Sequence, residues 1–290
     1  MRERIDGWGA AVMPRYHGRY IARAMAVVMA LVMRLDAVGH AQSSAGVTSA
    51  VREAPVVAAL EAARASEAQT LRDQVRFCEV PAPPFGERAR GELLKAEFER
   101  LGLQNVRVDA AGNVLGERPG LRVRPHLALA AHLDTVFPPD TDVRVRQDGT
   151  VLRGPGIGDN CRGLAVLVAV IRSLNQASVR TAGTITFVAN VGEEGLGNLR
   201  GVRELFGVAD KRGGSARRPT SDIDRFVSID GGGIYVATLA VGSRRYRVTF
   251  KGPGGHSFAA FGTPNPVNAL GRAVAKISEL RVPSVPRTTF

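Results

Sequence analysis

Residues 126–134 read His-Leu-Ala-Leu-Ala-Ala-His-Leu-Asp, an apolar run that ends in a histidine and an aspartate. A short continuous apolar run is typical of a strand that is buried on both faces, as in a parallel sheet. Residues 184–190 and 226–229 are also apolar and short, and residues 163–174 between the first two strands are predicted to form a buried helix. Strands that alternate with helices indicate an α/β fold with a mostly parallel sheet.

The other elements follow from hydrophobic periodicity and from Gly- and Pro-rich turns. The predicted strands cover residues 105–109, 113–117, 126–131, 184–190, 226–229 and 243–251, and residues 143–152 alternate around a turn at Asp148. The predicted helices cover residues 51–78, 87–101, 163–174, 199–206 and 265–280. The polar segment 207–221 is predicted to be a surface loop.

The composition is that of a globular protein. The 290 residues are 44% hydrophobic and 23% charged, which excludes wholesale disorder, collagen-like repeats and coiled coil. A formal net charge of +12 would suit binding to nucleic acid or to an anionic membrane. The basic residues are scattered outside the C-terminal segment, and we expect no nucleic-acid partner. Cys78 and Cys161 have no zinc-finger spacing and are predicted to be free buried thiols.

The amino terminus carries a candidate export signal. Residues 24–33 form an apolar run that is too short for a stable membrane span. Arginines precede it, and Gly39 and Ala41 after it supply small residues at the two positions that a signal peptidase reads. This pattern resembles a secretory signal peptide. We therefore expect residues 1–41 to be a signal peptide or N-terminal extension and residues 42–50 to be a linker. The expected location is periplasmic or secreted, with a cytoplasmic location as the alternative.

Four loops, each predicted to follow an apolar strand, carry carboxylate or imidazole groups. They contain His132 and Asp134, Asp159, Glu193 and Glu194, and Asp230. In an open α/β sheet, ligands bind beyond the carboxyl ends of the strands, so these loops are expected to face one crevice. Histidine and carboxylate groups together suit a divalent metal ion, and one carboxylate can bridge two ions.

The spacing within these loops suggests separate roles. His132 and Asp134 lie on the same side of an extended segment, so Asp134 is expected to hydrogen-bond the imidazole and fix its tautomer. The adjacent side chains of Glu193 and Glu194 point apart, so one can bind metal while the other accepts a proton from water. Each motif alone is common in turns and on surfaces. The hypothesis rests on their occurrence together.

As a set, these motifs resemble those of the M20 metallopeptidases. The matching stretches are AAHLDTVFP (130–138), GPGIGDNCRGLAVL (154–167), VGEEGLGN (191–198), SIDGGG (228–233) and GPGGHSFAAFGTPNPVNAL (252–270). The resemblance implies a zinc-peptidase-like α/β catalytic domain with a smaller α+β dimerisation, or lid, domain inserted into it. We assign residues 51–240 to an incomplete catalytic domain and residues 241–290 to part of the lid.

The resemblance also implies two zinc ions per subunit, with Co²⁺ or Mn²⁺ as alternatives. His132 and Asp230 would bind one ion, Glu194 would bind the other, and Asp159 would bridge both. The family takes its last metal ligand from a histidine after the lid, and no histidine of this chain follows His256. We therefore expect a weak second site in a C-terminally truncated chain with weak or no activity.

The implied reaction is metal-assisted hydrolysis of an amide bond in a small peptide or an N-acyl amino acid. Glu193 would act as the general base that takes a proton from the attacking water. Asp134 would orient His132. His256 would steady the oxyanion in the active site of a partner subunit, in a homodimer formed through the lid.

Two other functions remain open on the sequence. A non-catalytic remnant that binds one metal ion would differ from the enzyme only in turnover. A basic nucleic-acid-binding protein would depend on residues 240–290, which carry eight basic residues and one acidic residue. A dinucleotide site at Gly154-x-Gly156-x-Gly158 is disfavoured, because the charge of Asp159 would repel a pyrophosphate.

Overall fold

The computed structural model describes residues 49–208, 222–233, 235–240, 242–243, 245–285 and 287–290. The chain divides into two units, Met1–Ile234 and Tyr235–Phe290. The predicted signal peptide, most of the predicted linker and most of the predicted loop over residues 207–221 lie outside the described residues. Within the described part of the chain, no helix is both long enough and apolar enough to cross a membrane.

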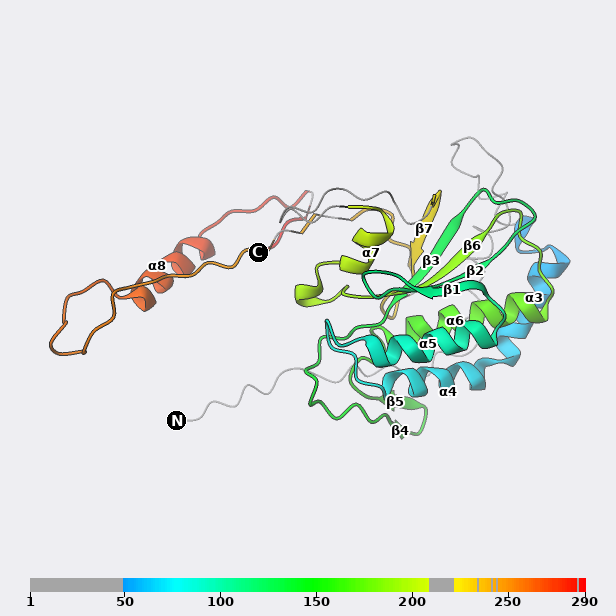
Figure 1. Ribbon diagram of the computed structural model, residues 1–290, viewed down its shortest axis with the longest axis horizontal. Helices are drawn as coiled ribbons and strands as arrows, with labels where there is room; N and C mark the ends of the chain where they lie inside the picture. Colours follow the sequence, from blue (N-terminus) through cyan, green and yellow to red (C-terminus); the bar gives the residue numbers. More distant parts are fainter. Residues whose placement is uncertain (1–48, 209–221, 234, 241, 244, 286) are drawn as a thin grey trace. The chain divides into compact units, whose positions relative to one another are not determined.

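The first unit is built on a five-stranded sheet with the strand order β1-β2-β6-β3-β7 (Figure 1). The strands are β1 (Gln104–Val108), β2 (Val114–Arg118), β3 (Leu127–His132), β6 (Ile185–Asn190) and β7 (Arg225–Ser228). β3 is parallel to β6 and β7, whereas β2 is antiparallel to both of its neighbours. Four strands therefore run in one direction and β2 runs in the other, which confirms the predicted α/β fold with a mostly parallel sheet.

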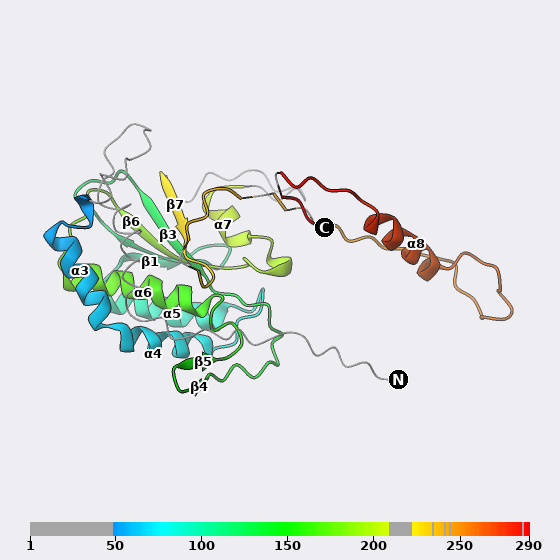
Figure 2. The same ribbon diagram turned by 180° about the vertical axis from the view of Figure 1, so that it is seen from behind.

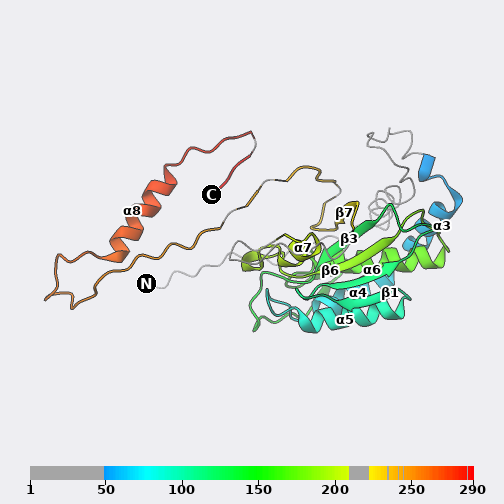
Figure 3. The same ribbon diagram turned by 45° about the horizontal axis from the view of Figure 1, so that its top comes forward.

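The two central strands determine where the loops after them begin. Every residue of β3 and β6 is buried, which explains why their sequences are continuously apolar. Their register pairs Leu127 with Ile185 and His132 with Asn190. The two strands therefore end at the same level, and the segments that follow them start side by side (Figure 3).

Four helices cover one face of the sheet (Figures 1 and 2). They are α3 (Ala54–Ala65), α4 (Glu67–Cys78), α5 (Arg88–Arg100) and α6 (Cys161–Gln176). Leu127 and Leu129 of β3 pack in the core on this face. Ala128 and Ala130 belong to a smaller cluster that includes Leu205 of α7 (Arg200–Leu205). The alternation of β3 side chains between the two faces is the period-2 pattern of a strand with both faces covered.

The helix predicted over residues 51–78 was wrong in one respect, because two helices occupy this segment. Ser66 leaves the helical conformation, with φ −92° and ψ 12°, and separates α3 from α4. Residues 143–152 form the predicted hairpin, with β4 (Arg146–Asp148) antiparallel to β5 (Val151–Arg153). Beside this hairpin, the predicted burial of Cys78 and Cys161 is confirmed, and both pack against Ile157.

The second unit contains α8 (Pro266–Ser278). Asn265 begins this helix, because its Oδ1 accepts a hydrogen bond from the Val267 N–H at 2.8 Å. The strand predicted over residues 243–251 was wrong, since the described residues of this segment form no strand. A strand needs a partner to satisfy its backbone N–H and C=O groups, and the described part of this unit offers no other strand.

Candidate metal centre

The candidate residues lie at one end of the sheet because parallel strands finish together. His132 is the last residue of β3, and the loop 191–194 after β6, here called the glutamate loop, carries Glu193 and Glu194. Asp230 follows β7, and Asp159 immediately precedes Asn160, which caps the N-terminus of α6. Four segments that are far apart in the sequence therefore meet at the carboxyl edge of the sheet.

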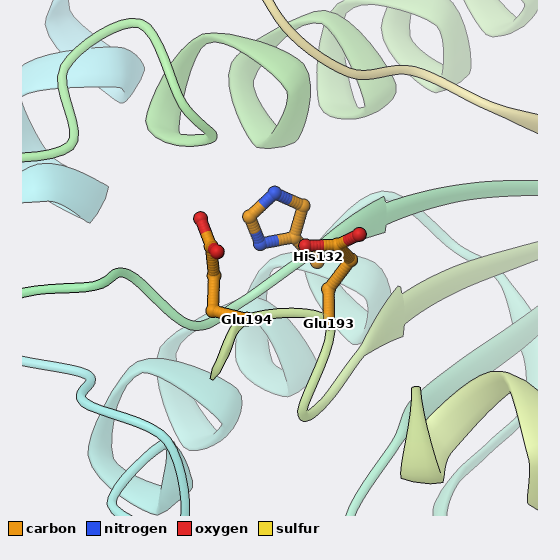
Figure 4. A group of neighbouring side chains, drawn as sticks. All are labelled: His132, Glu193 and Glu194. Atoms are coloured by element: carbon orange, nitrogen blue, oxygen red, sulfur yellow. The ribbon is translucent and has the colours of Figure 1, made fainter. Parts of the chain in front are cut away.

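His132 belongs to two groups of potential metal ligands. One group adds Asp159 and Asp230, and the other adds Glu193 and Glu194; within each group the ligand atoms lie within 4.8 Å of one another. Figure 4 shows the two glutamates on either side of the imidazole ring. His132 Nε2 lies 2.9 Å from Asp159 Oδ1 and 3.5 Å from Asp230 Oδ1. The histidine is buried while the two aspartates are partly exposed, so an ion can reach the group from solvent.

The imidazole of His132 is oriented by the backbone of Asp134. The hydrogen bond from Nδ1 is accepted by the carbonyl oxygen of Asp134 at 2.9 Å, while the carboxylate Oδ1 lies 3.6 Å away. We expected the carboxylate to fix the tautomer, and the closer contact comes instead from the carbonyl oxygen. A carbonyl oxygen can only accept, so Nδ1 carries a proton and Nε2 is the atom that can bind a metal ion.

The carboxylate of Asp134 holds the glutamate loop. Its Oδ1 accepts the N–H of Glu193 at 3.1 Å, and its Oδ2 accepts the N–H of Glu194 at 2.8 Å. Asp134 is fully buried. Burial alone would raise the pKa of Asp134, but His132 and the two backbone N–H groups lower it. The carboxylate therefore stays ionised and fixes the loop.

Negative charge accumulates around the imidazole. Burial raises the pKa of Glu194 to about 7, and the charges of Asp159 and Glu193 add to this effect. Burial, together with neighbouring aspartates, also raises the pKa of Glu193. Burial alone would lower the pKa of His132, but three aspartates raise it to about 12. A divalent cation would relieve this crowding of carboxylates, so the residues present fit a metal ion.

Asn160 connects two of the loops, and sequence reasoning gave it no role. Its Oδ1 accepts the N–H of Gly163 at 3.0 Å, and its Nδ2 donates to the carbonyl oxygen of Ile229 at 2.8 Å. The residue next to Asp159 is thereby tied to the residue before Asp230. The available signal was an asparagine directly before an apolar helix, which is typical of an N-cap.

Two other residues that sequence reasoning missed bind the backbone of the glutamate loop. Asn113 Oδ1 accepts the N–H of Val191 at 3.0 Å, and Glu87 Oε1 accepts the N–H of Gly192 at 3.2 Å. Asn113 and Glu87 are buried. Their partners lie 78 and 105 positions away in the sequence, so no local pattern could have identified these contacts.

A comparison with protein families shows which family this chain belongs to. The family model described as "Peptidase family M20/M25/M40" matches residues 128–289, which is more than half of the chain. The chain belongs to this peptidase family. The predicted resemblance to the M20 metallopeptidases is thus confirmed.

Several proteins are similar to this M20 chain. Carboxypeptidase G2 of Pseudomonas sp. (strain RS-16) is 32% identical over 157 residues, which cover 51% of this chain and 37% of the relative. A tripeptidase structure from Staphylococcus aureus has 25% identity and a TM-score of 0.46, covering 58% of this chain and 44% of that chain. A dipeptidase structure from Saccharomyces cerevisiae has 12% identity and a TM-score of 0.52, covering 76% and 52% respectively, and shows a shared fold. The M20 chain spans about half or less of the length of these proteins.

His256 lies in the second unit of the M20 chain. Its Nδ1 accepts the N–H groups of Phe258 at 3.3 Å and of Ala259 at 3.4 Å, and its side chain is exposed. These contacts belong to a local turn. The role of His256 in the active site of a partner subunit stays a prediction.

Proposed function

We propose that this M20 chain hydrolyses amide bonds of small peptides or N-acyl amino acids with the help of bound divalent metal ions, with zinc as the first candidate. The group of His132, Asp159 and Asp230 carries the proposal, with Glu193 and Glu194 close to the same imidazole. Membership of a peptidase family supports it, as does the similarity to a protein named carboxypeptidase G2. Both the substrate class and the metal are part of the proposal.

The proposed ligands divide between two ions. His132 and Asp230 would hold one ion, Glu194 would hold the other, and Asp159 would contribute to both. One nitrogen and several carboxylate oxygens form a donor set that suits zinc and also accommodates Co²⁺ or Mn²⁺. When bound, such ions supply a more acidic water and polarise a carbonyl group.

Glu193 is the proposed general base. Burial raises the pKa of its carboxyl group, so the carboxylate is a stronger proton acceptor than an exposed glutamate. Its backbone N–H is held by Asp134, which fixes the backbone of Glu193 relative to the segment that carries His132. In the proposed reaction, Glu193 takes a proton from the attacking water and delivers it to the nitrogen of the leaving amine.

The test is an assay of the 290-residue chain with dipeptides and N-acyl amino acids. We expect weak hydrolysis that a chelator abolishes and that added zinc restores. Glu193→Gln should lower kcat by about 10²–10⁴-fold, the range typical of general-base catalysis, without lowering the bound metal. The control is Glu61→Gln, which alters an exposed carboxylate on α3.

The possible results separate the proposal from its alternatives. Metal-dependent hydrolysis that persists in Glu193→Gln would contradict the assignment of the base. Bound zinc with no turnover of any substrate would instead favour a metal-binding protein without catalysis.

A further inference from the structure

We infer that Arg200 is a positioning residue that acts through Glu87 to hold the glutamate loop. The kinetic part of this inference rests on the proposed function, because it concerns the proposed base Glu193. The structural part stands on the contacts of Arg200 alone.

Arg200 and Glu87 form a largely buried ion pair beside the glutamate loop. Arg200 is the first residue of α7, and its Nη2 lies 2.7 Å from Oε2 of Glu87, the N-cap residue of α5. The side chains of Arg200 and Glu87 are 25% and 4% exposed, so solvent screens the pair weakly. The other oxygen of Glu87, Oε1, accepts the N–H of Gly192. One carboxylate thus binds the loop with one oxygen and Arg200 with the other.

The guanidinium of Arg200 also packs directly on the loop. Gly192 has φ +64°, and a Cβ at this position would collide with Nη1 of Arg200. On another side, the Arg200 Cζ lies 4.7 Å from the centroid of the Phe85 ring, within the range of a cation–π contact. Contacts with a carboxylate, an aromatic ring and a glycine backbone therefore fix the guanidinium.

Together with Asp134, this pair accounts for three consecutive backbone N–H groups of the loop. Glu87 accepts the N–H of Gly192, and Asp134 accepts those of Glu193 and Glu194. Loss of Arg200 would leave the buried Glu87 carboxylate without its cation, and Glu87 would then be free to turn away from Gly192. The loop would then lose the acceptor of the Gly192 N–H, one residue before Glu193.

A second buried pair in the chain provides a matched control. Nη2 of Arg172 on α6 pairs with Oδ2 of Asp73 on α4, and the two side chains are 11% and 2% exposed. In both Arg172 and Arg200, Nη1 is buried and has no hydrogen-bond partner within the described residues. Removing Arg172 therefore breaks a buried pair among the helices without touching the glutamate loop, although Asp73 keeps a second cation, Arg76, at 3.3 Å.

The test compares Arg200→Gln with Arg172→Gln by hydrogen–deuterium exchange of the metal-free protein. We expect amides 192–194 to exchange about tenfold faster in Arg200→Gln, since they open locally once their support is lost. Arg172→Gln should leave these amides unchanged although its global stability also falls. Arg200→Lys and Arg172→Lys give the same comparison if the glutamine variants do not fold.

The second readout is kinetic. Arg200→Gln should lower kcat by about 10²-fold, the loss expected from a displacement of about 1 Å, with little change in KM. Arg172→Gln should leave kcat unchanged. Equal exchange of amides 192–194 in the two variants would overturn the inference, whether or not the chain has hydrolase activity. Absence of wild-type turnover, by contrast, would count against the proposed function and leave the exchange result decisive.

Discussion

The carboxylate of Asp134 accepts the backbone N–H of Glu194 at 2.8 Å, although the two residues are 60 positions apart. Asp134 follows β3 and Glu194 follows β6, so this hydrogen bond joins the ends of two parallel strands. The position of the glutamate loop therefore depends on the same segment that carries His132.

Asp134→Asn keeps the shape of the side chain and changes its hydrogen bonds to the glutamate loop. Asparagine has a single acceptor oxygen, so either Glu193 or Glu194 would keep an unpaired N–H facing the new NH₂ group. We expect a loss of about 1–3 kcal/mol in the free energy of unfolding and a lower kcat, measured by urea unfolding and by steady-state kinetics.

Asp224→Asn is the control for this variant. Asp224 Oδ2 accepts the N–H of His126 at 2.7 Å, at the opposite end of β3 from His132. This substitution should lower stability and leave kcat unchanged. A similar fall of kcat in both variants would show that Asp134 acts through stability alone.

The proposed ligand sets predict three different patterns of metal loss. Asp230→Asn should weaken binding of one ion, Glu194→Gln should weaken the other, and Asp159→Asn should weaken both. Zinc titration by calorimetry measures each affinity, and thermal unfolding gives an independent check. Zinc at about 100 times its Kd should raise the free energy of unfolding by about 2.7 kcal/mol. Identical titrations for the three variants would contradict the proposed division.

Glu97 should contribute stability that depends on pH. It is buried and pairs with Arg76 at 3.0 Å and with Arg100. Burial alone would raise the pKa of Glu97, but hydrogen bonds from the two guanidinium groups lower it below the ordinary value of 4.5. The contribution is therefore complete above pH 4.5 and is lost as pH falls through the lowered pKa.

The substitution that tests this is Glu97→Gln. At pH 7 we expect a destabilisation of about 2 kcal/mol relative to the wild type, which should shrink as the pH falls below about 4. Urea unfolding across this range measures the difference. Glu99→Gln alters an exposed pair with Lys95 and should have little effect at any pH. A difference that stays constant with pH would rule out the ionised pair as its source.

Substitution by alanine should lower stability at one glycine and raise it at another. A Cβ at Gly201 would lie 2.6 Å from the carbonyl oxygen of Val191 and would clash with Asn113. Gly201→Ala should therefore cost about 1–3 kcal/mol and displace the start of the glutamate loop. A Cβ at Gly271 in α8 meets no atom within 4 Å, and alanine there should stabilise the helix by about 1 kcal/mol.

Circular dichroism with thermal unfolding checks both substitutions. Unchanged stability in Gly201→Ala would contradict the close approach of α7 to the end of β6.

The parts of the fold that could be predicted are those with strong local signals. The core strands β3 and β6 are buried on both faces, so their sequences are continuously apolar and their bounds follow within a residue. The reversed direction of β2 could not be predicted, because its sequence does not identify its partner. Apolar and polar residues alternate over 243–251 as they do in strands. Whether the segment forms a strand depends on a pairing partner, which this alternation cannot reveal.

For the candidate site, the sequence could predict which residues lie together but not the contacts that hold them. The rule that ligands bind beyond the carboxyl ends of parallel strands grouped His132 with Asp230. Asp159 was expected to follow a strand of the same sheet, but it lies between the separate hairpin β4–β5 and helix α6. The rule could not show that Asp134 contacts the imidazole through its carbonyl oxygen, since either oxygen type can accept. Nor could it find Glu87 and Arg200, whose pairing spans 113 positions and leaves no local pattern.

The parallel pairing of β3 with β6 has a consequence for the order of folding. Parallel neighbours cannot be joined by a tight turn, and here the chain passes through the hairpin β4–β5 and helix α6 before it returns to the sheet. Such distant segments meet late, because the entropy cost of closing a long loop precedes the favourable contacts that offset it. The proposed metal ligands are therefore separated in the unfolded chain, and we expect them to come together late in the folding reaction. Bound zinc should accordingly slow unfolding while leaving the rate of refolding nearly unchanged.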